Sequence, residues 1–235
     1  MMAFPVQTYA RVAGVLFLLS MVAGGIGEMY VPSKLIVSTD AAMTAQNLRS
    51  ADSLFRIGFA SYLVEGLCDV ALAWILYVLL RPVHKELALL AAFFGLVSTA
   101  LFGFAELFYF ASSLVLRDAD YLKSFSPDQR NTLALLALKT YSLGAGGFMA
   151  FYGVATLLRG YLMFRSGYLP KFLGILLVIA GLGFVTKNFL LVLAPAYDSG
   201  LLLLPVALAG VSLTVWFLAK GVDVRKWEER AAAFE

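Results

Sequence analysis

The chain has 235 residues, of which 61% are hydrophobic and only 14% are charged, and its mean hydropathy is +0.86. These values are typical of a polytopic membrane protein, and the length leaves little room for a separate soluble domain. The net charge of +3 gives no reason to expect nucleic acid as a partner. One cysteine and one histidine, His84, exclude an internal disulfide, a thiolate metal cluster, a zinc hydrolase and a haem protein, so we expect no metal and no other cofactor.

Six segments are apolar over the roughly 20 residues that a helix needs to cross a bilayer. They are residues 10–30, 57–80, 87–114, 132–158, 170–194 and 199–220. The predicted fold is therefore all-α, with residues 1–235 forming a single domain, a bundle of six transmembrane helices.

The first predicted span carries Glu28 in its final turn. In the connection 31–55 that follows, Ser38-Thr39-Asp40 predicts an N-cap for a short surface helix over 41–50, with an ordered loop as the alternative. Just before the second span lies Arg56, which we expect to pair with Asp52 or with lipid headgroups.

Two acids of the second span, Glu65 and Asp69, lie four residues apart and share a helix face with Tyr62 one turn earlier. In the third span, Glu106 shares a face with Phe102 and Tyr109. These two faces are the acidic part of the predicted site.

The connection 117–131 ends in Ser126-Pro127, which predicts the start of the fourth span at Pro127. Within that span Lys139 and Ser142 share a face, and nearby glycines at 144, 146 and 147 favour close helix packing. The fifth span carries Lys187 near its end, with Asn188 beside it. Trp216 and Trp227, near the end of the sixth span, suit a membrane interface.

Basic residues gather after the second, fourth and sixth spans. They are Arg81, His84 and Lys85; Arg159, Arg165 and Lys171; and Lys220, Arg225, Lys226 and Arg230. The positive-inside rule therefore predicts that these connections and both termini face the cytoplasm, in a multi-pass membrane protein.

Seven charged side chains fall inside or at the edge of the predicted spans. They are Glu28, Arg56, Glu65, Asp69, Glu106, Lys139 and Lys187. Facing lipid, they would together cost about 20 kcal/mol, so they must face each other or water. With the predicted orientation they lie in the outer half of the bundle, and the inner half has almost none.

Two interpretations of these charges remain open. In the first, they are structural ion pairs between helices. In the second, they line a water-accessible cavity in the outer half, formed by Tyr62, Glu65, Asp69, Glu106, Tyr109, Lys139, Ser142, Lys187 and Asn188. Both predict that Lys139 or Lys187 pairs with Glu65, Asp69 or Glu106, because an unpaired buried charge is costly.

The chain resembles, from end to end, a bacterial family of integral membrane proteins catalogued as domain of unknown function four-three-eight-six. The matching stretches are Tyr9–Gly14, Lys34–Val37 with Asp40–Ala42, Leu54–Gly58, Cys68–Ala73, Leu79–Val83 and Arg165–Pro170. The resemblance implies a six-helix protein of a bacterial inner membrane and assigns no activity.

Our leading hypothesis is that the cavity binds or transports a small polar or amphiphilic ligand, with membrane lipids as the other partners and the oligomeric state left open. The alternative is a membrane-embedded enzyme that acts on a lipid or isoprenoid, with Glu65 or Asp69 as the catalytic acid. A third hypothesis is an accessory subunit in which the charges only hold the helices together.

Overall fold

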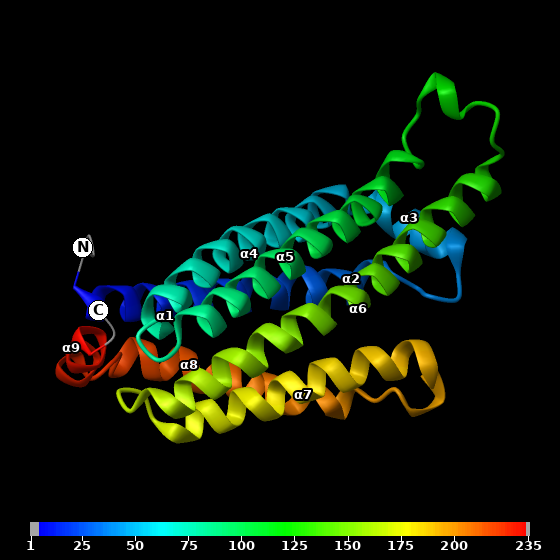
Figure 1. Ribbon diagram of the computed structural model, residues 1–235. Helices are drawn as coiled ribbons and strands as arrows, with labels where there is room; N and C mark the ends of the chain where they lie inside the picture. Colours follow the sequence, from blue (N-terminus) through cyan, green and yellow to red (C-terminus); the bar gives the residue numbers. More distant parts are fainter. Residues whose placement is uncertain (1–4, 234–235) are drawn as a thin grey trace. The chain divides into compact units, whose positions relative to one another are not determined.

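The computed structural model describes residues 5–233, and every element in this part of the chain is helical (Figure 1). Six of its helical segments are long and apolar enough to cross a membrane: Val6–Leu35, Asp52–Leu80, Lys85–Leu114, Pro127–Ser166, Lys171–Leu193 and Gly200–Ala219. The predicted six-helix fold is confirmed. The fourth segment differs most from its predicted range, because its 40 residues run eight residues past the expected end.

The first crossing segment combines three elements, α1 (Val6–Gly24), the π-helix η1 (Gly25–Tyr30) and α2 (Val31–Leu35). The other helices are α3 (Ala41–Ser50), α4 (Asp52–Leu80), α5 (Lys85–Leu114), α6 (Pro127–Ser166), α7 (Lys171–Leu193), α8 (Leu204–Ala219) and α9 (Val224–Ala232). Short 3-10 turns occur at Asp120–Leu122, Pro195–Tyr197 and Gly200–Leu203.

Capping residues start the helices where the sequence predicts. The Asp40 side chain accepts a hydrogen bond from the Met43 N–H at 2.9 Å, which confirms the short helix α3. At the start of α6, Ser126 and Gln129 form a reciprocal pair: the Gln129 N–H donates to Ser126 Oγ at 3.3 Å and the Ser126 N–H to Gln129 Oε1 at 2.8 Å. Arg56 pairs with Asp52 at 2.6 Å, as expected.

The chain divides into two compact units. The described residues of unit 1 are 5–20, 67–99 and 146–233, and unit 2 comprises residues 21–66 and 100–145. Helices α1, α4, α5 and α6 each contribute one part to unit 1 and another to unit 2.

Unit 1 is built around a large apolar core to which α1, α4, α5, α6, α7, α8 and α9 contribute, with Leu76, Leu162, Leu173 and Phe217 fully buried. Helices α7 and α8 lie side by side as a hairpin (Figure 1). Glycines bring α6 and α7 into backbone contact at two levels: a Cβ at Gly160 would lie 2.8 Å from the Gly174 carbonyl oxygen, and one at Gly181 would lie 2.7 Å from that of Gly153.

Unit 2 has an aromatic core. Phe55 of α4 stacks on Tyr109 of α5 with ring centroids 4.5 Å apart, and both are almost fully buried together with Tyr62. The short helix α3 packs against α2, and Thr44 Oγ1 of α3 exchanges hydrogen bonds of 2.9 Å with the backbone of Val37, two residues after α2. These contacts fix the segment that follows η1.

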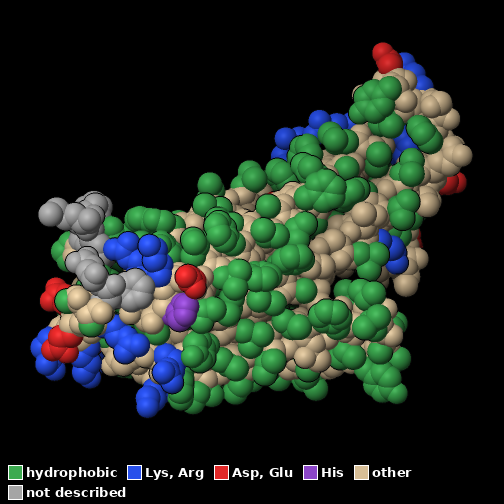
Figure 2. Space-filling model, viewed as in Figure 1, with side chains coloured by type: hydrophobic (Ala, Val, Ile, Leu, Met, Phe, Trp, Pro, Cys, Tyr) green, Lys and Arg blue, Asp and Glu red, His purple; other side chains and the backbone are tan. Residues whose placement is uncertain are grey.

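Large apolar side chains cover the outer surface of the long helices (Figure 2). Leu67, Trp74 and Phe93 are more than half exposed, and many other leucines, valines and phenylalanines are similarly open. A continuous surface of this kind is unfavourable in water and favourable against lipid chains. The six crossing segments therefore lie in a membrane.

Candidate functional site

A π-helical turn interrupts the first crossing segment and shapes one side of the candidate site. In η1 the hydrogen bonds skip one residue more than in an α-helix, a rare arrangement that is frequent at functional sites. Tyr62 of α4 donates its hydroxyl proton to the Gly27 carbonyl oxygen at 2.7 Å. Gly27 leaves room for this contact, because a Cβ at this position would lie 3.0 Å from the Tyr62 ring. Glu28, the next residue, is exposed.

Tyr141 of α6 is the centre of the polar groups in unit 2. Its hydroxyl is hydrogen-bonded to that of Tyr62, and it interacts electrostatically with three glutamates, Glu28, Glu65 and Glu106. Because the only Tyr62 hydroxyl proton is donated to Gly27, Tyr141 donates to the Tyr62 oxygen. We call Glu28, Glu65, Glu106, Tyr62, Tyr109 and Tyr141 the acid–tyrosine cluster.

Glu106 of α5 is the most buried acid of this cluster. It is only 5% exposed, and its Oε1 atom has no hydrogen-bond partner among the residues that the structure describes. Glu28 interacts electrostatically with Glu106, so two negative charges would repel each other there. A buried carboxyl group with an unused acceptor is a place where a donor or a cation would bind favourably.

Glu65 of α4 lies against Gly24 at the end of α1. A Cβ at Gly24 would be 3.2 Å from Glu65 Oε1, so this glycine gives the carboxyl group room next to the helix backbone. The three glutamates thus come from three different crossing segments. Their exposure decreases from Glu28, which is exposed, through the intermediate Glu65 to the buried Glu106.

Three tyrosine rings form the apolar part of the cluster. Tyr62, Tyr109 and Tyr141 are mutual neighbours, with centroid distances of 5.2, 5.4 and 5.6 Å and interplanar angles of 50° or more. Phe102 adds an edge-to-face contact with Tyr62 at 5.7 Å. Tilted aromatic rings beside carboxyl groups are the chemistry that recognises organic cations. Within residues 5–233, no three acidic, histidine or cysteine side chains are placed so that they could hold a metal ion.

Sequence reasoning identified four members of the cluster as site residues, Tyr62, Glu65, Glu106 and Tyr109, and named Glu28 among the intramembrane charges. It missed Tyr141, although Ala134, Leu138 and Tyr141 have the spacing of one buried helix face.

Lys139 and Ser142 do share a face of α6, but both side chains are exposed. No ion pair among the described residues includes Lys139, so its expected pairing with Glu65 or Glu106 is not found.

Asp69 belongs to unit 1, and its oppositely charged partner is Arg159, which the sequence analysis placed in a connection outside the spans. Ser20 Oγ donates to Asp69 Oδ1 at 3.5 Å, and Asp69 interacts electrostatically with Arg159. The expectation that Arg159 lies in the connection after the fourth span is wrong: it is inside α6 and 7% exposed. The prediction that the inner half of the bundle has almost no charged side chains did not include Arg159, because that residue was placed outside the spans, whereas α6 continues to Ser166.

Lys187 pairs with Asp198 in the turn between α7 and α8, with Nζ and Oδ1 2.5 Å apart, and both side chains are about one-fifth exposed. The expected pairing of Lys187 with Glu65, Asp69 or Glu106 is therefore replaced by a local pair within one hairpin. Asn188, beside it, is buried and donates to the Phe184 carbonyl at 3.2 Å, one turn earlier in the same helix. Both interactions stabilise the end of α7.

Six lipid-facing helical segments and an intramembrane cluster of acids define an integral, multi-pass membrane protein. The chain belongs to the family described as Domain of unknown function (DUF4386), whose model matches residues 12–221. It is similar to an uncharacterized protein of the archaeon Archaeoglobus fulgidus, with 30% identity over 153 residues that make up 65% of this chain and 76% of that protein. No solved structure shows a significant match to the chain.

Proposed function

We propose that this protein binds a small amphiphilic organic cation at the acid–tyrosine cluster and carries it through the membrane in exchange for protons. The observation that carries the proposal is Glu106, a carboxyl group that is buried in a membrane helix and whose Oε1 has no hydrogen-bond partner among residues 5–233. Ionisable side chains inside a membrane are costly to keep, so they are usually functional.

The chemistry of the cluster favours a cation over an anion. The cluster contains three glutamates and no lysine or arginine. No ion pair among the described residues includes Glu106. A cationic ligand would supply the missing charge, and the Tyr62, Tyr109 and Tyr141 rings would contact its apolar part. When the ligand leaves, protons can neutralise the same carboxyl groups, which couples the two species.

The depth of the acids supports a transfer role. At 1.5 Å per residue, Glu106 lies about 12 Å from the end of α5 at Leu114, and Glu65 about 20 Å from the start of α4 at Asp52. Glu28 lies seven residues, or about 10 Å, from the end of its crossing segment at Leu35, and it is exposed. A ligand or proton would thus meet the exposed Glu28 before the buried Glu106.

Titration calorimetry of the purified protein in detergent tests the proposal with benzyltrimethylammonium and its uncharged isostere neopentylbenzene. We expect the cation to bind more tightly at pH 8 than at pH 5, because protons compete for the carboxylates, and Glu106→Gln to weaken binding by about tenfold or more. Glu86→Gln, in the exposed first turn of the same helix, is the matched control and should bind like wild type. Equal affinity of Glu106→Gln and wild type, or of the two probes, would contradict the proposal.

A further inference from the structure

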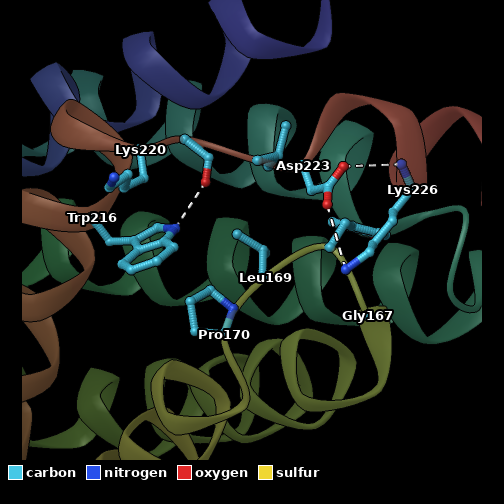
Figure 3. Close-up of a pocket in the computed structure, with 10 residues that line it drawn as sticks. Gly167, Leu169, Pro170, Trp216, Lys220, Asp223 and Lys226 are labelled. Atoms are coloured by element: carbon cyan, nitrogen blue, oxygen red, sulfur yellow. Dashed lines mark hydrogen bonds and ion pairs between the residues drawn. The ribbon is translucent and has the colours of Figure 1, made fainter.

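A second polar site lies at one end of unit 1, where α6 leads into α7 and α8 into α9. It is a cavity of about 400 Å³ between the turn 167–170 and the turn 220–223 (Figure 3). Its walls combine two lysines, one aspartate, two aromatic rings and the backbone of both turns. The lining residues that matter below are Tyr168, Pro170, Trp216, Lys220, Asp223 and Lys226.

Hydrogen bonds from distant parts of unit 1 hold the 220–223 turn in place. The Gln7 amide donates to the Lys220 carbonyl at 2.7 Å and accepts from the Val222 N–H at 3.0 Å. Gly221 adopts a φ of +72°, which favours glycine, and a Cβ there would lie 2.5 Å from Gln7 Oε1. The Trp216 indole N–H donates to the Gly221 carbonyl at 2.8 Å. The cavity is therefore preformed.

The opposite wall is fixed through the end of α4. Tyr168 and Trp227 both donate to the Leu79 carbonyl, at 2.7 and 3.0 Å, and the Asp223 N–H donates to the Tyr168 carbonyl at 3.1 Å. Burial raises the pKa of the Tyr168 phenol, so it remains a neutral donor. None of these bonds involves the side chain of Lys220 or Lys226.

The cavity carries one net positive charge. Asp223 and Lys226 both line the cavity and form an ion pair, with Oδ2 and Nζ 3.4 Å apart (Figure 3). Lys220 is exposed and is in no ion pair among the residues that the structure describes. A ligand with a single negative charge matches this balance, and the Asp223 carboxylate would accept hydrogen bonds from hydroxyl groups beside that charge.

The surroundings place such a ligand at a lipid surface. Trp216 makes an edge-to-face contact at 6.1 Å with Phe172, which is 49% exposed on the first turn of α7. Basic side chains gather at this end of unit 1, next to the apolar surface of its helices (Figure 2). Tryptophan and lysine side chains at the end of a crossing helix are typical of contacts with headgroups.

We propose that this cavity is a binding site for the phosphodiester headgroup of an anionic phospholipid such as phosphatidylglycerol. Lys220 and Lys226 contact the phosphate, Asp223 accepts from the headgroup hydroxyls, and Trp216 with Pro170 contacts the glycerol and the start of the acyl chains. A phosphodiester carries one negative charge, which balances the single net positive charge of the cavity, whereas phosphatidylcholine has no net charge.

Native mass spectrometry of the full-length protein, titrated with phosphatidylglycerol or phosphatidylcholine in detergent, measures this binding. Each lysine close to an anionic headgroup contributes a factor of about five, so we expect Lys220→Gln/Lys226→Gln to lose about 25-fold in affinity for phosphatidylglycerol. Asp223→Asn should raise that affinity, since it removes the competing negative charge while asparagine still caps α9. The matched control is Lys85→Gln, at the start of α5 in the same unit and outside the cavity.

Two outcomes would overturn the assignment. One is a double variant that binds phosphatidylglycerol as tightly as Lys85→Gln does, which would mean that only the overall charge of this end matters. The other is displacement of the lipid by an equal concentration of inorganic phosphate, which would make free phosphate the ligand. Opposite effects of the lysine and aspartate variants, with native helicity by circular dichroism, separate a binding defect from misfolding.

Discussion

Arg159 of α6 and Asp69 of α4 are opposite charges that interact in the interior of unit 1. Gly95 of α5 makes room for the guanidinium group, because a Cβ at that position would lie 2.5 Å from Arg159 Nη2. Three helices thus meet around one buried cation. Since a buried charge is tolerated only with compensating partners, the two residues depend on each other for stability.

We predict that Arg159→Met and Asp69→Asn each lower the free energy of unfolding by about 2–4 kcal/mol, because each removes the opposite charge that compensates the remaining one. The double variant should lose at least about 1 kcal/mol less than the sum of the two. Unfolding in mixed micelles with increasing dodecyl sulfate, followed by circular dichroism, provides the values. Arg165→Met, at an exposed position of the same helix, is the control, and strictly additive losses would show that the charges do not interact.

The glycines between α6 and α7 lead to a second prediction. Gly160→Ala places a methyl group 2.8 Å from the backbone of Gly174 and Val178, so the helices must separate, at a cost of about 1–3 kcal/mol. Gly147→Ala, in the same helix but with open space around it, should be neutral or stabilising by up to about 1 kcal/mol. The melting temperatures of both variants in the same detergent decide the matter, and equal melting temperatures would contradict close packing at Gly160.

Tyr62→Phe removes the hydroxyl that the Gly27 carbonyl accepts from in the π-helical turn. A buried carbonyl without a donor costs about 1–3 kcal/mol, and Tyr141 loses its acceptor in the same step. Hydrogen exchange of the amides in 25–31 should become faster, which locates the change in η1. Tyr121→Phe, at a tyrosine that is 71% exposed, should leave both stability and exchange as in wild type.

A pH dependence is expected at α9. The Lys226 N–H donates to the Asp223 carboxylate and, with the charges of Lys226 and Arg225, lowers the pKa of Asp223 below its ordinary value of 3.8. Asp223 therefore stabilises α9 above about pH 4, and this contribution is lost as the pH falls through the lower, folded-state pKa. Amide exchange of 224–227, normalised for its intrinsic pH dependence, should show a loss of protection on acidification that is absent in Asp223→Asn.

The residues that the sequence identified correctly are those whose signal is local. Asp40 and Ser126 start helices by contacts three residues away, Asp52 and Arg56 lie one turn apart, and the apolar runs fix the crossing segments. Helical phase also placed Phe102 and Tyr109 on one face of α5, and both contact Tyr62.

The residues that the sequence missed depend on where helices end and how they pack. Arg159 resembled a flanking basic residue only because the fourth span was expected to end at residue 158, and a 40-residue helix of about 60 Å exceeds the thickness of a bilayer. Asp198 lies in a short turn whose shape no periodic pattern reveals. Tyr141 was hidden because an aromatic residue in an apolar helix is common, whereas Lys139 two positions earlier attracted attention through its charge.

The π-helical turn at Gly25–Tyr30 also determines how this chain responds to a change of length. A π-turn accommodates one residue more than an α-helix of the same rise, so deleting Ile26 would restore regular α-helical hydrogen bonding without breaking the helix. The segments on either side would then keep about the same rotation around the helix axis, because the wider turn takes up the extra residue. We expect the deletion to leave Gly24 against Glu65 and to change only the turn that carries Gly27 and Glu28. One extra residue in a membrane helix therefore sets the local position of the glutamate that interacts with Glu106 and Tyr141.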